Sequence, residues 1–113
     1  MDLVRDIVAH LSDDLGVRVA AERPENPDER MVTVRRVGGG GDRFMDTARI
    51  DVTVWAESYK AAYILAKLAE ESMFGLPAYS ANVASVEQNS FYSNTYTDGT
   101  PRWTGVYVIV CNR

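Results

Sequence analysis

Residues 2–15 place apolar side chains at three- and four-residue spacing. The apolar residues are Leu3, Val4, Ile7, Val8, Leu11 and Leu15. An α-helix completes a turn in about 3.6 residues, so this spacing gathers them on one face. Gly16 follows as a natural helix terminator. The pattern therefore predicts an amphipathic helix over residues 2–15.

The next part of the chain predicts strands separated by breaks. Residues 17–21 predict a short strand, and residues 22–30 predict a solvated loop because they combine two prolines with charged side chains. Residues 31–37 are rich in β-branched side chains and predict another strand, which we expect the glycines at 38–41 to end. The clearest alternation of apolar and polar residues covers residues 47–56 and predicts a strand with one buried and one partly solvated face.

A second helix is predicted over residues 58–73, because Ser58 is a suitable N-cap and an apolar stripe follows it. The stripe consists of Ala61, Ile64, Leu65, Leu68 and Ala69. Residues 82–88 predict a strand, and residues 90–101 predict a polar and aromatic connection. The final stretch, 102–111, is apolar on both sides, which places it in the middle of a sheet or under a neighbouring subunit.

These elements predict an α+β fold in the order α-β-β-β-α-β-β. We expect a mostly antiparallel sheet of about four to five strands, with the two helices packed on one face. That arrangement leaves the other face with little cover from its own chain. We therefore expect a partner to supply the missing cover.

Composition narrows the class of protein. The 113 residues suit a single domain spanning 1–113, and the apolar stretches are too short to cross a membrane. The first residues lack the basic start and apolar core of a secretory signal, so we expect the protein to stay in the cytoplasm where it is made. The net charge of -4 argues against general attraction to nucleic acid phosphates.

The sequence carries no recognisable catalytic or metal-binding motif. Its single histidine, His10, lies at the edge of the first apolar stripe, and its single cysteine, Cys111, lies far away in the last predicted strand. The glycine run at 38–41 lacks the Lys-Ser/Thr ending of a phosphate-binding loop, and a strand follows it where that motif requires a helix. We interpret the chain as a protein without enzymatic activity, cofactor or metal.

Charged and aromatic residues near the glycine run are the candidates for an interface. If the flanking strands pair as a hairpin, the arginines can gather at one end or on one face of the sheet. These arginines are Arg35, Arg36, Arg43 and Arg49. The competing interpretation is ordinary strand-edge charge, which prevents unwanted pairing. Trp55 falls on the polar side of its strand near Arg49 and Asp51, a composition typical of a subunit interface.

Three segments carry a resemblance to a known family. They are MVTVRRVGGGGDRFMDTARIDVTVWAES, YKAAYILAKLAEES and DGTPRWTGVYVIVCNR. Together with the amphipathic first helix they resemble the tail terminator, or tail completion, proteins of long-tailed bacteriophages and prophages. The resemblance spans nearly the whole chain and consists of order and composition, without a catalytic signature.

The resemblance implies an α+β structural protein that forms a ring, commonly a hexamer. Such a ring caps the tail tube protein, stops tail polymerisation and presents a surface to the head-tail connector protein. It implies no cofactor, and it implies assembly in the host bacterial cytoplasm and a final place in the virion, at the tail or neck. A heterologous contact repeated around a closed rotation gives a ring with two different faces, which suits this task.

We assign the interface residues from their position, because the family has no motif that specifies them. The glycine-rich hairpin is a natural segment to become ordered on a partner, and the polar positions of the following strand are candidates for subunit contact. The candidates are Arg35, Arg36, Gly39, Gly40, Asp42, Arg43, Arg49, Asp51 and Trp55. Two alternatives stay open: another neck component, such as a head-closure or adaptor subunit, and a small ligand-binding α+β domain.

Overall fold

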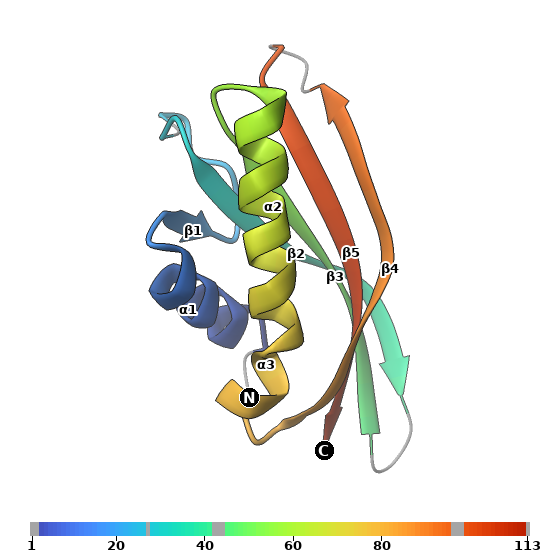
Figure 1. The fold of residues 1–113 in the computed structure, drawn as a ribbon. Helices are drawn as coiled ribbons and strands as arrows, with labels where there is room; N and C mark the ends of the chain where they lie inside the picture. The colour runs from blue at the N-terminus through green and yellow to red at the C-terminus, as the bar shows by residue number, and fades with distance from the viewer. Residues whose placement is uncertain (1–2, 27, 42–44, 96–98, 113) are drawn as a thin grey trace.

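The computed structural model describes residues 3–26, 28–41, 45–95 and 99–112. Three helices and five strands follow one another along these residues (Figure 1). Their order is α1 (Leu3–Leu15), β1 (Arg18–Ala20), β2 (Met31–Gly41), β3 (Met45–Trp55), α2 (Tyr59–Phe74), α3 (Leu76–Tyr79), β4 (Val83–Thr95) and β5 (Pro101–Asn112). The short helix α3 was not predicted from the sequence.

The five strands form one sheet in the order β1-β2-β3-β5-β4. Neighbouring strands run antiparallel, except that β1 and β2 run parallel. This arrangement confirms the predicted α+β class with a mostly antiparallel sheet. It also places β5 between β3 and β4, which explains why both of its sides are rich in apolar residues.

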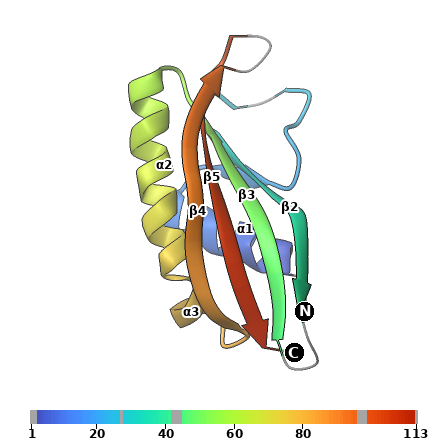
Figure 2. The ribbon, with the colours of Figure 1, turned by 90° about the vertical axis from the view of Figure 1, so that its right-hand side faces the viewer.

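The hydrophobic core lies between the sheet and the helices. Leu3, Ile7 and Leu11 of α1 are buried in it, as the helical spacing predicts. The same cluster contains the buried side of β3, represented by Ile50 and Val52. Figure 2 looks onto the β4 edge of the sheet and shows α2 and α3 together on one side. We call this side the helix face and the opposite side the outer face.

The glycines of β2 do not end the strand, which corrects the prediction for residues 38–41. The strand continues to Gly41 because β3 pairs with it from Met31 opposite Trp55 to Gly41 opposite Asp46, with one shift of register between Arg36 and Gly38. Gly39 has φ 153°, and a side chain there would overlap the carbonyl oxygen of Thr47. Glycine is thus required by the close approach of two strands, and it does not act here as a breaker.

Helix α2 begins where the sequence indicated. The Ser58 side chain accepts a hydrogen bond of 3.1 Å from the backbone N–H of Ala61, which satisfies one of the free donors of the first turn. The helix ends at Phe74 with Gly75 as its C-cap, and Pro77 lies in the first turn of α3. The backbone N–H of Gly75 donates to the carbonyl of Glu71, so the chain turns without losing its hydrogen bonds.

Strand β4 is longer than the sequence indicated. The predicted connection over residues 90–101 is wrong for its first part, because β4 runs on to Thr95 and pairs with β5 as far as Pro101. Two shifts of register, at Ala84 and Asn89, interrupt the pairing. Backbone pairing with a strongly apolar neighbour therefore outweighs the weak strand preference of the polar residues in this segment.

Candidate functional site

The outer face of the sheet is the surface that the sequence pointed to as unfinished. No described helix lies over it, and only the segment between β1 and β2 crosses its upper part (Figure 2). On β5, Val108 and Val110 point to this face and are only half-buried.

Three of the predicted site residues lie together on this face. Arg49 and Asp51 alternate with the core residues of β3, and Arg35 of β2 lies directly opposite Asp51 across the two strands. Arg35 and Arg49 are exposed, whereas Asp51 is half-buried. The predicted pairing of the two strands is therefore present, and it brings opposite charges side by side.

Other predicted residues lie elsewhere. Arg36 is opposite Ile50 and so belongs to the helix face, where its guanidinium lies 3.8 Å from a carboxylate oxygen of Asp46. Gly39 and Gly40 are exposed in the extended part of β2. The candidates Asp42 and Arg43 lie outside the described residues. The arginines near the hairpin therefore divide between the two faces and do not form one cluster.

Trp55 lies on the outer face, as the alternation predicted, but its own chain covers it. The side chain is only 5% exposed, and the guanidinium of Arg23 lies 5.4 Å from the centre of its ring. A cation over an aromatic face adds attraction to the packing. Trp55 therefore fixes the segment between β1 and β2 onto the sheet. Its contact with another subunit stays a prediction, and the cover from its own chain makes that contact smaller.

A groove of about 590 Å³ opens beside Trp55 on the same face. Three arginines line it, Arg23, Arg35 and Arg102, together with two acidic residues, Glu22 and Asp51. The groove is thus polar and carries one more positive than negative side chain. It has the chemistry to accept a polar or anionic group, whether that group belongs to a protein or to a small molecule.

Threonines form the floor of this groove. The hydroxyl oxygens of Thr53 and Thr104 lie 3.2 Å apart across β3 and β5 and share a hydrogen bond. Thr104 is buried, and Tyr92 of β4 stands exposed at the side of the groove. The sequence alternation placed Thr53 on this face, but the contribution of β4 was missed because the strand was predicted to end at residue 88.

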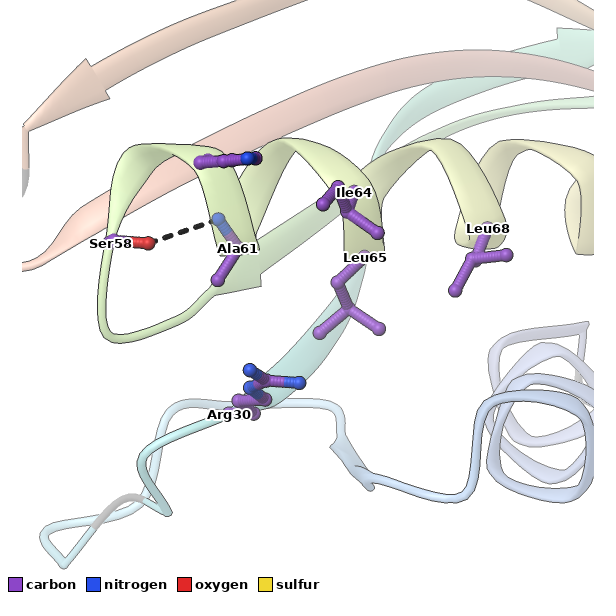
Figure 3. Close-up of a pocket in the computed structure, with 7 residues that line it drawn as sticks. Arg30, Ser58, Ala61, Ile64, Leu65 and Leu68 are labelled. Carbon is purple, nitrogen blue, oxygen red and sulfur yellow. Dashed lines mark hydrogen bonds between the residues drawn. The ribbon is translucent and has the colours of Figure 1, made fainter.

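A second surface was missed by the sequence pattern. Ile64 and Leu68 of α2 were assigned to the apolar stripe, yet they are 51% and 49% exposed. They line a hollow of about 220 Å³, with Leu65 at its base and Arg30 on the opposite side (Figure 3). One feature of the sequence indicated this exposure. Lys60, Ile64 and Leu68 follow one another at four-residue spacing and so lie on the same side of the helix, and the charge of Lys60 marks that side as the edge of the buried stripe.

Arg30 is held across this hollow by an ion pair with Glu57. Its Nε atom donates to both carboxylate oxygens of Glu57, at 3.1 and 2.9 Å, and its Nη2 atom also donates to one of them. This hydrogen bonding lowers the pKa of Glu57 to about 2. The pair links the end of the segment before β2 to the start of α2.

His10 belongs to a polar contact between helices. It is 7% exposed, and its Nε2 atom lies 2.8 Å from the backbone carbonyl oxygen of Ser72, to which it donates. The Ser72 hydroxyl donates to Asp14 at 2.7 Å. In a nucleophilic triad the histidine must accept the serine proton. Here the serine hydroxyl is bound to the carboxylate instead, so this group joins α1 to α2 and is not arranged for that chemistry.

Two further titratable groups, Tyr107 and Cys111, are buried in the packed interior. Burial raises the pKa of Tyr107 to about 12, although Gln88 donates a hydrogen bond of 3.3 Å to its hydroxyl. Burial also raises the pKa of the Cys111 thiol, which keeps it protonated and unreactive.

Within the described ranges, no three His, Cys, Asp or Glu side chains gather as metal ligands. No described helix is long and apolar enough to span a membrane.

Comparison with known proteins adds no assignment. A scan against protein-family models finds no match, and a search of curated proteins also finds none. The functional proposal therefore rests on the outer face of the sheet and on the resemblance of the sequence.

Proposed function

We propose that this chain is a non-enzymatic structural subunit of a long-tailed bacteriophage or prophage. In this proposal its copies form a ring, six by the resemblance of the sequence to tail terminators. The ring caps the tail tube, ends its polymerisation and offers its other side to the head-tail connector. The virion neck is the place of action, after assembly in the bacterial cytoplasm.

The observation that carries the proposal is the outer face of the sheet. Val108 and Val110 are half-buried there with no described helix above them, Arg49 lies opposite Val108, and Arg35 and Asp51 lie further along the same face. An apolar centre with a charged rim is the usual anatomy of a protein interface. Copies joined through different patches of their surfaces close into a ring with two distinct ends.

The test of the proposal is the length of tail tubes. A tail tube protein from the same genome would be polymerised with and without the purified chain, and tube lengths would be measured by electron microscopy. We expect capped tubes that stop growing when the chain is present. Tubes of unchanged length without a ring at their ends would overturn the proposal.

A variant of the outer face sharpens this test. Val110→Asp places a charge on the apolar part of the face, opposite the uncharged Thr47 and Ser85, and should abolish capping, because a buried unpaired charge is costly at an interface. Val110→Thr is the matched control, since it keeps the branched shape and the strand preference. Folding of both variants would be checked by circular dichroism. Equal capping by both would remove this face from the mechanism.

The groove beside Trp55 favours one competing function, a small ligand-binding domain. Its three arginines could hold an anionic molecule on the outer face. Crystals soaked with small dicarboxylates would show the difference. A molecule bound in the groove of a chain that stays monomeric or dimeric would support the ligand-binding function, whereas an empty groove in a ring would support the assembly function.

A further inference from the structure

Both edges of the sheet are open for most of their length. Among the described residues no strand pairs with the far side of β4, which lies in front of the other strands in Figure 2. At the other edge, β1 pairs with β2 only at residues 31–33. Residues 35–41 of β2 are exposed, and their far side is not covered by any described strand. Figure 1 shows this end of β2 at the margin of the molecule.

An open edge carries free backbone N–H and C=O groups, which another strand can bind. Proteins usually block such edges with lysine, proline, charge or bulges. Strand β4 contains no lysine and no proline, and its one charged residue is Glu87. Two bulges interrupt it, but the strand is still 13 residues long. This is an unusually long edge to leave without a partner.

The directions of the two edges are compatible with each other. Successive antiparallel pairings from β2 through β3 and β5 to β4 make β4 run opposite to β2. A rotation about an axis along the strands does not change strand direction. The β4 edge of one copy therefore meets the β2 edge of the next copy in the antiparallel sense, which is the sense of the rest of the sheet.

The charges on the two edges are complementary. Glu87 of β4 is opposite Val108, and Val108 is opposite Arg49, so Glu87 lies on the outer face. Arg35 of β2 lies on the same face, and both side chains are exposed. Beyond Arg35, Gly38 and Gly40 carry no side chains, so another strand can approach closely. The register of β2 shifts between Arg36 and Gly38, and the exposed Arg36 side chain, which donates to the Gly38 carbonyl at 3.4 Å, has to move aside for such a strand.

We propose that copies of this chain join through these edges, with β4 of one copy paired antiparallel to residues 35–41 of β2 in the next copy. The sheet then continues from copy to copy around the ring. Glu87 is level with Gly38 across the sheet, so at each junction it lies diagonal to Arg35 on the outer face, within reach of that long side chain. This inference rests on the proposed ring. It specifies which surfaces of neighbouring copies meet, and it uses backbone hydrogen bonds as the main attraction.

Engineered disulfides test the pairing. Cysteines at Gly38 and Ser85 lie on the outer face of the two edges and leave Arg35 and Glu87 in place. Gly38 tolerates a side chain, because an added Cβ would meet only the Cβ of Arg49 at 3.9 Å. Opposite residues of antiparallel strands are close enough for a disulfide. Ser85 is level with Gly40 across the sheet, so Gly40→Cys with Ser85→Cys tests the unshifted register, and the pair with Gly38 covers a register shifted by two residues. The space around Gly40 is open.

Each double variant should give a ladder of linked dimers, trimers and larger species on oxidation, because every copy carries both halves of the junction. Each single variant should stay unlinked, and an equal mixture of the two single variants should stop at dimers. The natural chain is the background control, because its only cysteine is buried. Circular dichroism would confirm that every variant is folded.

Each outcome decides the inference. A ladder supports it. Dimers from Ser85→Cys alone would show two β4 edges paired about a twofold axis and would overturn it. Rings seen by native mass spectrometry without any ladder would overturn the pairing and leave the proposed function intact. Monomers without any ladder would overturn both.

A charge variant gives a second measurement. Glu87→Arg places like charges against each other at every junction and should shift the equilibrium from ring to monomer in sedimentation. Glu71→Arg changes the same charge at an exposed position of α2 and is the control. An equal effect of the two variants would contradict a contact at Glu87.

Discussion

At the scale of single residues, Gly39 decides how β2 can pair with β3. Gly39→Ala should destabilise the protein by about 1–3 kcal/mol, because φ 153° is open only to glycine and the new methyl group would overlap the backbone of β3. Chemical denaturation would measure the loss in unfolding free energy. Gly40→Ala is the control, since nothing lies within 4 Å of its added Cβ. Equal losses would show that the strained backbone is not the cause.

Glu57 makes the stability of the folded protein depend on pH in the acidic range. Its folded-state pKa is lowered to about 2 from the ordinary 4.5, chiefly by the hydrogen bond from Arg30. The carboxylate therefore contributes stability above pH 4.5, and this contribution is lost as the pH falls from 4.5 towards 2. The pair is on the surface, so its contribution is modest.

The corresponding variant is Glu57→Gln. It should lower the melting temperature slightly at neutral pH and should flatten the change in melting temperature between pH 4.5 and pH 2, because the titrating group is gone. Thermal melts across this pH range would measure both effects. A variant whose pH profile matches that of the natural chain would show that the ion pair does not contribute in solution.

At the scale of elements, the start of α2 depends on one side chain. Ser58→Ala removes the acceptor for the N–H of Ala61 and should cost about 1 kcal/mol of stability. Ser58→Asp keeps an acceptor at the same position and should restore most of it. Denaturation midpoints of the three proteins would be compared. Identical midpoints for the alanine and aspartate variants would show that capping is not what the serine provides.

Local and distant interactions explain which elements the sequence predicted well. Both long helices were predicted to within a residue or two, because caps and apolar spacing lie within the helix itself. Strands β2 and β4 were predicted too short, because their ends are held by pairing with β3 and β5. Glycines and polar residues form strand there only in the presence of those neighbours.

The same distinction applies to the candidate site. Alternation along β3 correctly placed Arg49, Asp51 and Trp55 on one face, since side chains in a strand alternate strictly. It could not show that Arg23 covers Trp55, because that contact depends on the path of a segment 32 positions earlier in the chain. It also could not show which apolar residues of α2 stay exposed, since Ile64 and Leu68 have the same spacing as buried neighbours.

At the scale of the whole molecule, helices cover one face of the sheet, no described helix lies over the other face, and both edges are open for most of their length among the described residues. On that other face Trp55, Thr104 and Val106 are already buried, whereas Val108 and Val110 are only half-buried. A ring gives each of these surfaces a partner, because every copy then meets two neighbours through different patches. The resemblance to tail terminators supplies the number of copies and the task. The structure supplies surfaces that such an assembly would use.

Native mass spectrometry of the purified chain tests the ring most directly. Across a range of concentrations, we predict a closed species of six copies of the 12.6 kDa chain. On dilution it should dissociate without open chains of more than six copies. Monomers at every concentration would contradict the account.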